Sequence, residues 1–128
     1  MNGNSLSDYY YNHSFMDGLR KRLPEILPNT YCIVAIDIEH FRLFNKLYGR
    51  SSGDEVIRYI YTCLEQSALE YDGIDAYLGG DNFVAFLPDD DEVLNNIRQK
   101  IIKKFSKWNN TSAFFPLFGV YTIEDTSV

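Results

Sequence analysis

The feature that most constrains the fold is the stretch DAYLGGDNFVAFLP, which spans residues 75–88. Two apolar runs flank a Gly-Gly-Asp-Asn tip, and this pattern is typical of a β-hairpin with a tight, charged turn. Another strand is predicted over residues 31–37, YCIVAID, because a continuous apolar and β-branched run is typical of a strand buried on both faces. The chain must therefore fold around a sheet whose strands end in acidic residues.

Helical periodicity predicts the remaining elements. Apolar residues recur at three- and four-residue spacing in four segments: residues 6–27, 40–49, 52–70 and 89–108. In the first of these helices the residues expected to face inward are Tyr11, Phe15, Met16, Leu19, Leu23 and Ile26. Residues 113–123 predict a last strand, in which Pro116 indicates an irregularity or a sheet edge. This order predicts an α+β fold, an α/β sandwich in which helices pack on a mixed, mainly antiparallel sheet.

Composition limits the size of the molecule and its partners. The 128 residues are enough for one compact domain and too few for two ordinary ones. The formal net charge of −6 argues against nucleic acid as a partner, because phosphate backbones require a basic face. No apolar run approaches the roughly 20 residues of a membrane span, and the N-terminus does not resemble a signal peptide. Cys32 and Cys63 do not indicate a disulfide framework, so we expect a cytoplasmic location without membrane contact.

Two acids lie where neighbouring strands of one sheet would bring them together. Asp37 ends the strand over residues 31–37, and Asp81 lies at the hairpin tip. Adjacent carboxylates repel each other unless a cation lies between them, and hard oxygen ligands beside a nucleoside triphosphate favour Mg²⁺. The alternative, which spacing alone favours, is that Asp37 only caps the next helix and Asp81 only forms the turn.

Two motifs together resemble the GGDEF domain, the diguanylate cyclase family. The motifs are DIEHFRLFNKLYGRSSGDEVIRYI and YLGGDNFVAFLP, and the resemblance covers residues 31–88 well and continues less closely to residue 120. It implies a nucleotide-cyclase, ferredoxin-like palm with its core over residues 31–123, preceded by the N-terminal helix. We expect residues 1–128 to form a single, partial GGDEF domain cut from a larger multidomain protein.

The resemblance also implies a role for each residue that matches a family motif. The implied metal ligands for Mg²⁺ are Asp37, the backbone carbonyl of Ile38, and Asp81. The implied nucleotide-binding residues are Phe41, Asn45, Asp54, Gly79 and Gly80. Asn45 and Asp54 would read the edge of a guanine, because an amide and a carboxylate complement its polar groups and would leave adenine unpaired. The nucleotide expected is therefore GTP, and the implied catalytic positions are Asp81 and Asn82.

The sequence departs from the family at several of these positions. Asn82 replaces the Glu of the signature, and a neutral amide is a weak metal ligand and no base. Tyr77 stands where the family usually has Arg. Glu70 and Gly73 occupy the positions of the family's inhibitory Arg-x-x-Asp, so product feedback at that site is not expected. The family's closing helix and strand, which bring a Lys and an Arg to the phosphates, would follow residue 128.

Three functions remain open on the sequence alone. The first is a degenerate GGDEF domain of a bacterial cyclic-di-GMP signalling protein, which binds GTP or regulates a neighbour with weak or no cyclase activity. The second is an active diguanylate cyclase that makes cyclic-di-GMP from two GTP molecules. The third is an interaction module that binds no nucleotide. The possible protein partners are a second copy of the chain, in a homodimer, or an adjacent signalling domain such as an EAL-type phosphodiesterase.

Overall fold

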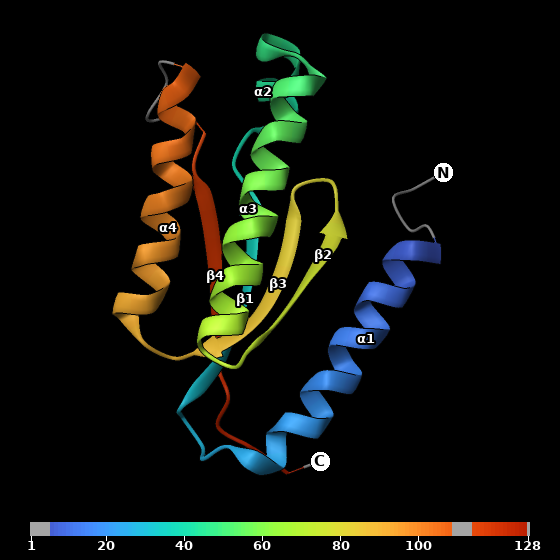
Figure 1. Ribbon diagram of the computed structural model, residues 1–128, viewed down its shortest axis with the longest axis vertical. Helices are drawn as coiled ribbons and strands as arrows, with labels where there is room; N and C mark the ends of the chain where they lie inside the picture. The colour runs from blue at the N-terminus through green and yellow to red at the C-terminus, as the bar shows by residue number, and fades with distance from the viewer. Residues whose placement is uncertain (1–5, 109–113, 128) are drawn as a thin grey trace.

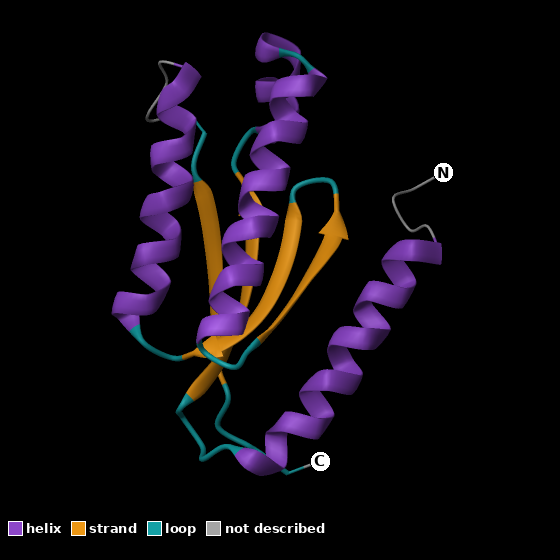
Figure 2. Cartoon of the chain, viewed as in Figure 1, coloured by secondary structure: helices purple, strands orange, loops and turns teal. Residues whose placement is uncertain are grey.

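The computed structural model describes residues 6–108 and 114–127, with side chains described from residue 13 onward. The predicted order of elements is confirmed, with two short 3₁₀-helices added (Figures 1 and 2). The helices are α1 (Leu6–Arg22), α2 (Phe41–Tyr48), α3 (Arg50–Glu70) and α4 (Asp91–Phe105), with 3₁₀-helices η1 (Leu23–Glu25) and η2 (Ser106–Trp108). The strands are β1 (Tyr31–Ile38), β2 (Ile74–Gly79), β3 (Asn82–Pro88) and β4 (Pro116–Thr122).

The four described strands form one sheet in the order β2-β3-β1-β4. The prediction of an α+β fold with a mainly antiparallel sheet is confirmed, and every pairing among the described strands is antiparallel. β4 is an edge strand, and Pro116 is its first residue. This position suits proline, because proline has no backbone N–H to donate to a neighbouring strand. The hairpin predicted from residues 75–88 is β2 and β3, with Gly79 opposite Asn82 across the turn.

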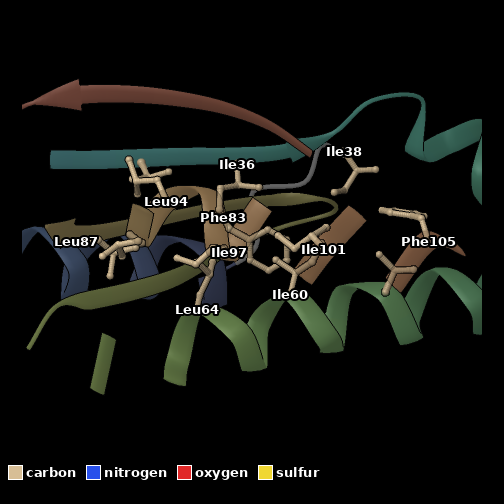
Figure 3. Close-up of a cluster of buried hydrophobic side chains, with 14 of the residues drawn as sticks. Ile36, Ile38, Ile60, Leu64, Phe83, Leu87, Leu94, Ile97, Ile101 and Phe105 are labelled. Atoms are coloured by element: carbon tan, nitrogen blue, oxygen red, sulfur yellow. The ribbon is translucent and has the colours of Figure 1, made fainter. Parts of the chain in front are cut away.

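The main core lies between one face of the sheet and helices α2, α3 and α4 (Figure 3). Alternate residues of β1 contribute Cys32, Val34, Ile36 and Ile38, each at most 3% exposed. α3 and α4 contribute the apolar residues that helical spacing predicts, which are Val56, Ile60, Cys63, Leu64, Val93, Leu94, Ile97, Ile101 and Phe105. Burying these side chains supplies most of the free energy that stabilises the fold, at about 25 cal/mol per Å² of apolar area.

The opposite face of the sheet is only partly covered. α1 packs beside β2 there (Figure 1). On that side of the sheet, Phe15, Ala76 and Phe86 form a smaller buried cluster. The prediction that β1 is buried on both faces is therefore wrong, because α1 does not extend over Ala35, which is exposed. Met16 is also 44% exposed rather than inward. The side chain of Tyr11 lies outside the described part of the chain.

Local signals set the helix ends. α1 ends at Arg22, five residues before the predicted end, and the following turn is η1 with Pro24 near its start, since proline has no N–H for an α-helical bond. α4 begins after Asp90, whose carboxylate accepts from the backbone N–H groups of Glu92 and Val93 at 2.8 and 3.3 Å. Within the described residues, no helix has the length and apolar character needed to cross a membrane.

Candidate functional site

The sheet brings together the two acids that the sequence singled out. Asp37 lies at the end of β1, and the backbone N–H of Ile38 donates to Asp81 Oδ2 at 2.8 Å. Burial raises the pKa of the Asp37 carboxyl, and the negative charges of Asp81 and Glu39 raise it further. The end of β1 therefore holds two carboxylates whose mutual repulsion a cation would relieve.

The turn that carries Asp81 is held by specific contacts. Gly79 and Gly80 adopt positive φ angles of 99° and 56°, which side chains with a Cβ rarely adopt. The Tyr77 hydroxyl donates to the Gly80 carbonyl at 2.6 Å, and its ring centroid lies 5.0 Å from that of Phe83. Tyr77, which departs from the family pattern, thus supports the turn directly.

α2 and the hairpin tip lie at the same end of the sheet (Figure 1). A cleft of about 640 Å³ is lined by residues of both. Its lining residues are His40, Phe41, Arg42, Asn45, Lys46, Arg50, Gly80 and Asp81. Four of the predicted site residues therefore share one cleft: Phe41, Asn45, Gly80 and Asp81.

Other predicted site residues lie around this cleft rather than in its lining. Asp54 lines a separate hollow of about 420 Å³. The other lining residues are Ile57, Arg58 and Tyr61 of α3 and Tyr77 of β2. Asp37 and Asn82 line a third hollow, of about 350 Å³, on the partly covered face of the sheet. Ile38 is buried, and Gly79 is partly buried at the end of β2. The structure thus places the two predicted guanine-reading residues on neighbouring helices with different surroundings.

Asn45 is held in the cleft wall by an unusually close neighbour. A Cβ on Gly53 would lie 1.8 Å from Asn45 Oδ1 and 3.3 Å from Phe41 Cζ, so only glycine leaves room for this amide. Asn45 Oδ1 is buried and has no hydrogen-bond partner among the described residues. A buried polar atom without a partner costs about 1–3 kcal/mol, and this cost would be removed if the amide turned toward the cleft and its oxygen accepted from an N–H donor on a ligand.

Sequence reasoning missed the basic residues of the cleft. Arg42, Lys46 and Arg50 all line it, although the chain as a whole has a net charge of −6. Arg42 and Lys46 are four residues apart on α2, so they project from the same face of that helix. This spacing is visible in the sequence FRLFNK and would have identified two of the three.

The first turn of α2 adds to the positive potential. Its N-cap residue, His40, has a left-handed backbone (φ 60°, ψ 30°) and provides no side-chain hydrogen bond to the helix. The first N–H groups of a helix have no partner within it, and together with the helix dipole they attract anions. The cleft therefore combines a helix N-terminus, three cations and a carboxylate.

The residues at the end of β1 suit a magnesium ion that also binds phosphate. Among residues 6–108 and 114–127 there is no group of three or more His, Cys, Asp or Glu side chains placed to hold a metal. Mg²⁺ usually takes one or two carboxylates and completes its coordination with phosphate and water. Asp37 and Asp81 supply the carboxylates, and Ile38, which follows Asp37 in the chain, donates its backbone N–H to Asp81.

Solved structures of GGDEF domains share this fold. The GGDEF domain of DgcB from Caulobacter crescentus in complex with c-di-GMP aligns with a TM-score of 0.64 and 23% identity, over 86% of this chain and 68% of that one. The active GGEEF domain of a diguanylate cyclase from Vibrio cholerae aligns with a TM-score of 0.64 and 20% identity, over 91% of this chain and 75% of that one. At these identities the likeness shows the fold.

Sequence comparison shows the family. Residues 10–115 match the family described as diguanylate cyclase, GGDEF domain, and the chain belongs to it. Diguanylate cyclase DgcM of Escherichia coli (strain K12) is 40% identical over 62 residues, which are 48% of this chain and 15% of DgcM. The probable diguanylate cyclase DgcT of the same strain is 28% identical over 86 residues, 67% of this chain and 19% of DgcT. The chain is thus a GGDEF domain related to diguanylate cyclases of cyclic-di-GMP signalling, and it spans under a fifth of these relatives.

Proposed function

We propose that this domain binds GTP with Mg²⁺ in the cleft between α2 and the hairpin tip, and acts as a regulatory, degenerate GGDEF domain. The observation that carries the proposal is Asn45 Oδ1, which is buried in the cleft wall without a hydrogen-bond partner among the described residues. Guanine presents two adjacent N–H donors on its Watson–Crick edge, whereas adenine presents one donor beside an acceptor, so the Asn45 oxygen and the Asp54 carboxylate together would favour guanine.

The phosphates of GTP would lie toward the first turn of α2 and Arg42. Backbone N–H groups and a guanidinium are the usual partners of phosphate oxygens. Asp37, Asp81 and the Ile38 carbonyl would hold Mg²⁺ at the neighbouring strand end, where it would neutralise phosphate charge when bound. The support for this arrangement is the shared cleft and the contact of Asp81 with the Ile38 N–H.

Asn82 is the reason that we expect weak or no cyclase activity. The cyclase reaction removes a proton from a 3′-hydroxyl, and an amide at the signature position supplies neither a base nor a charged ligand. Asn82 is exposed at the start of β3, so nothing in its described surroundings changes this chemistry. The retained acids Asp37 and Asp81 favour a second candidate function, an active cyclase.

The domain organisation is also part of this proposal. We infer that residues 1–128 form one partial GGDEF domain of a longer protein, in which a second copy or an EAL-type phosphodiesterase domain is the partner. The support is the family match over residues 10–115 together with the small share of the relatives that the chain spans.

Calorimetry with GTP and ATP, in Mg²⁺ and with the 128-residue chain, tests the nucleotide choice. We expect GTP to bind at least about 10²-fold more tightly than ATP, the ratio expected when buried polar groups lose their partners. Asn45→Ala should remove this preference, and Asn95→Ala, at an exposed position of α4, should leave it unchanged. Equal affinity for the two nucleotides would overturn the proposal.

Product analysis separates the regulatory domain from the active cyclase. The longer protein that contains this domain and its Asn82→Glu variant would be incubated with GTP and Mg²⁺, and cyclic-di-GMP measured. Little product from the unmodified protein and a gain in the Glu variant would support the degenerate reading. Rapid turnover by the unmodified protein would establish the active cyclase instead.

A further inference from the structure

The basic residues of the cleft form a cationic wall, which we define as Arg42, Lys46 and Arg50. Arg42 and Lys46 lie one helical turn apart on α2, and Arg50 begins α3 two residues after α2 ends. All three line the cleft that Asn45 and Asp81 also line. Three of the chain's 12 lysine and arginine residues therefore converge on one cleft of an acidic protein.

The cationic wall is not neutralised by the protein. Within residues 6–108 and 114–127, none of its three members forms an ion pair, whereas Lys104 and Lys107 both pair with Glu55. Among the described residues, Asp81 is the one carboxylate that lines the cleft, and it already accepts a hydrogen bond from the Ile38 N–H. Three cations thus face a single carboxylate, which leaves the cleft with a net positive charge.

We propose that Lys46 and Arg50 extend the Arg42 contact into a phosphate-binding wall that holds a polyphosphate anion without requiring Mg²⁺. The inference rests on the same cleft as the proposed function and deepens it by assigning the anion-binding residues and the metal dependence. Lysine and arginine make charge-assisted hydrogen bonds to phosphate oxygens, and their long side chains reach an anion from several directions. With three such cations present, a metal ion adds to the neutralisation of the phosphate charge but is not required for the anion to bind.

Inorganic triphosphate in the presence of EDTA is the direct probe, because it carries the phosphates without the base or the metal. Calorimetry with the 128-residue chain should show saturable binding that weakens as NaCl is raised from about 0.05 to 0.5 M, since salt screens exposed charges. The double variant Lys46→Ala/Arg50→Ala should bind at least about tenfold more weakly, the loss expected for two charge-assisted hydrogen bonds.

The matched control removes the same charge elsewhere. Lys100→Ala/Lys103→Ala takes two exposed cations from α4, outside the cleft lining, and should bind triphosphate as the wild type does. Thermal unfolding of both double variants checks that they fold, and Lys46→Glu is a second variant that should abolish binding by charge reversal.

The results separate this inference from the proposed function. No triphosphate binding in EDTA, or equal weakening by the two double variants, would overturn the cationic wall. Equal binding of GTP and ATP would overturn guanine recognition while leaving the wall intact. A triphosphate affinity in EDTA that falls only in the cleft variants would establish the wall whichever nucleotide the cleft prefers.

Discussion

Gly53→Ala is the substitution whose consequence the structure predicts most sharply. Gly53 is buried in the first turns of α3, with the Asn45 amide against the position that a Cβ would fill. A Cβ there would stand 1.8 Å from Asn45 Oδ1, far inside contact distance, so one of the two groups must move. The Asn45 side chain is the group that moves more easily, because it can rotate without disturbing either helix backbone. We therefore expect the amide to leave its position in the cleft wall.

Any loss of stability should be small because stabilising and destabilising effects oppose each other. Alanine favours a helix interior over glycine by about 1 kcal/mol. Moving the Asn45 side chain away from its preferred rotamer costs about 0.5–1.5 kcal/mol, and the contact of the new Cβ with Phe41 Cζ at 3.3 Å adds a little more. Moving Asn45 Oδ1 out of its buried, unpaired position also removes a cost of about 1–3 kcal/mol, so the free energy of unfolding should not fall by more than about 1 kcal/mol, which is a decrease of at most about 4 °C in melting temperature.

Nucleotide recognition, in contrast, should change as much in Gly53→Ala as in Asn45→Ala, which deletes the amide. GTP affinity of Gly53→Ala should fall at least about tenfold, toward that of Asn45→Ala, while ATP affinity stays constant. The side-chain NH₂ signals of Asn45 in a ¹⁵N–¹H correlation spectrum should shift, which reports the displacement without any ligand. Thr62→Ala, at an exposed position of α3 far along the helix, is the control for helix propensity. Unchanged Asn45 signals with unchanged GTP affinity would refute the reasoning.

Three further predictions concern single residues. Millimolar Mg²⁺ should raise the melting temperature of the wild-type chain, because only the native site binds the ion, and Asp37→Asn should abolish this rise; an equal rise in both proteins would exclude Asp37 as a ligand. Asp75→Asn should increase the free energy of unfolding at pH 7, because burial raises the pKa of the Asp75 carboxyl and the folded state disfavours its charge. This gain should shrink as the pH falls through the raised pKa and vanish below about 3.8, where the carboxyl is protonated in both states, as urea denaturation at each pH would show. Tyr77→Phe should lower the free energy of unfolding by about 1 kcal/mol and weaken Mg²⁺ binding, because it loses the bond to the Gly80 carbonyl that holds the turn. Tyr121→Phe, at an exposed position of β4, should do neither.

The element order could be predicted because it depends on local periodicity. The spacing of apolar residues in α3 and α4 follows from their burial against one sheet face, so sequence and structure agree there. The burial of β1 could not be predicted in the same way. Its apolar run is continuous, yet only the part of its second face that α1 reaches is covered, and Ala35 lies beyond it. The extent of that cover depends on how α1 docks, which no local pattern of β1 encodes.

The candidate site also has a part that local sequence patterns predict and a part that depends on tertiary packing. The meeting of Asp37 with Asp81 could be expected from strand ends, and the contact through the Ile38 N–H agrees with it. The contact of Gly53 with Asn45 joins two helices through side-chain packing, and periodicity says nothing about such pairs. The cationic wall was missed because a basic residue at an exposed helix position is usually only solvated, and its convergence on a cleft is a tertiary property.

Under the proposed function, the hairpin tip explains how ligand binding and turnover would be separable in this domain. The contacts that fix the turn come from the Tyr77 hydroxyl, the positive φ of Gly79 and Gly80, and the bond between Asp81 and the Ile38 N–H. Among the described residues, the Asn82 side chain takes part in none of them and stays exposed. The residue at this position can therefore change from an acid to an amide without altering the turn, the cleft or the position of Asp81. Under the proposed function, an amide at position 82 therefore carries no structural penalty, which is the condition under which ligand binding persists without turnover.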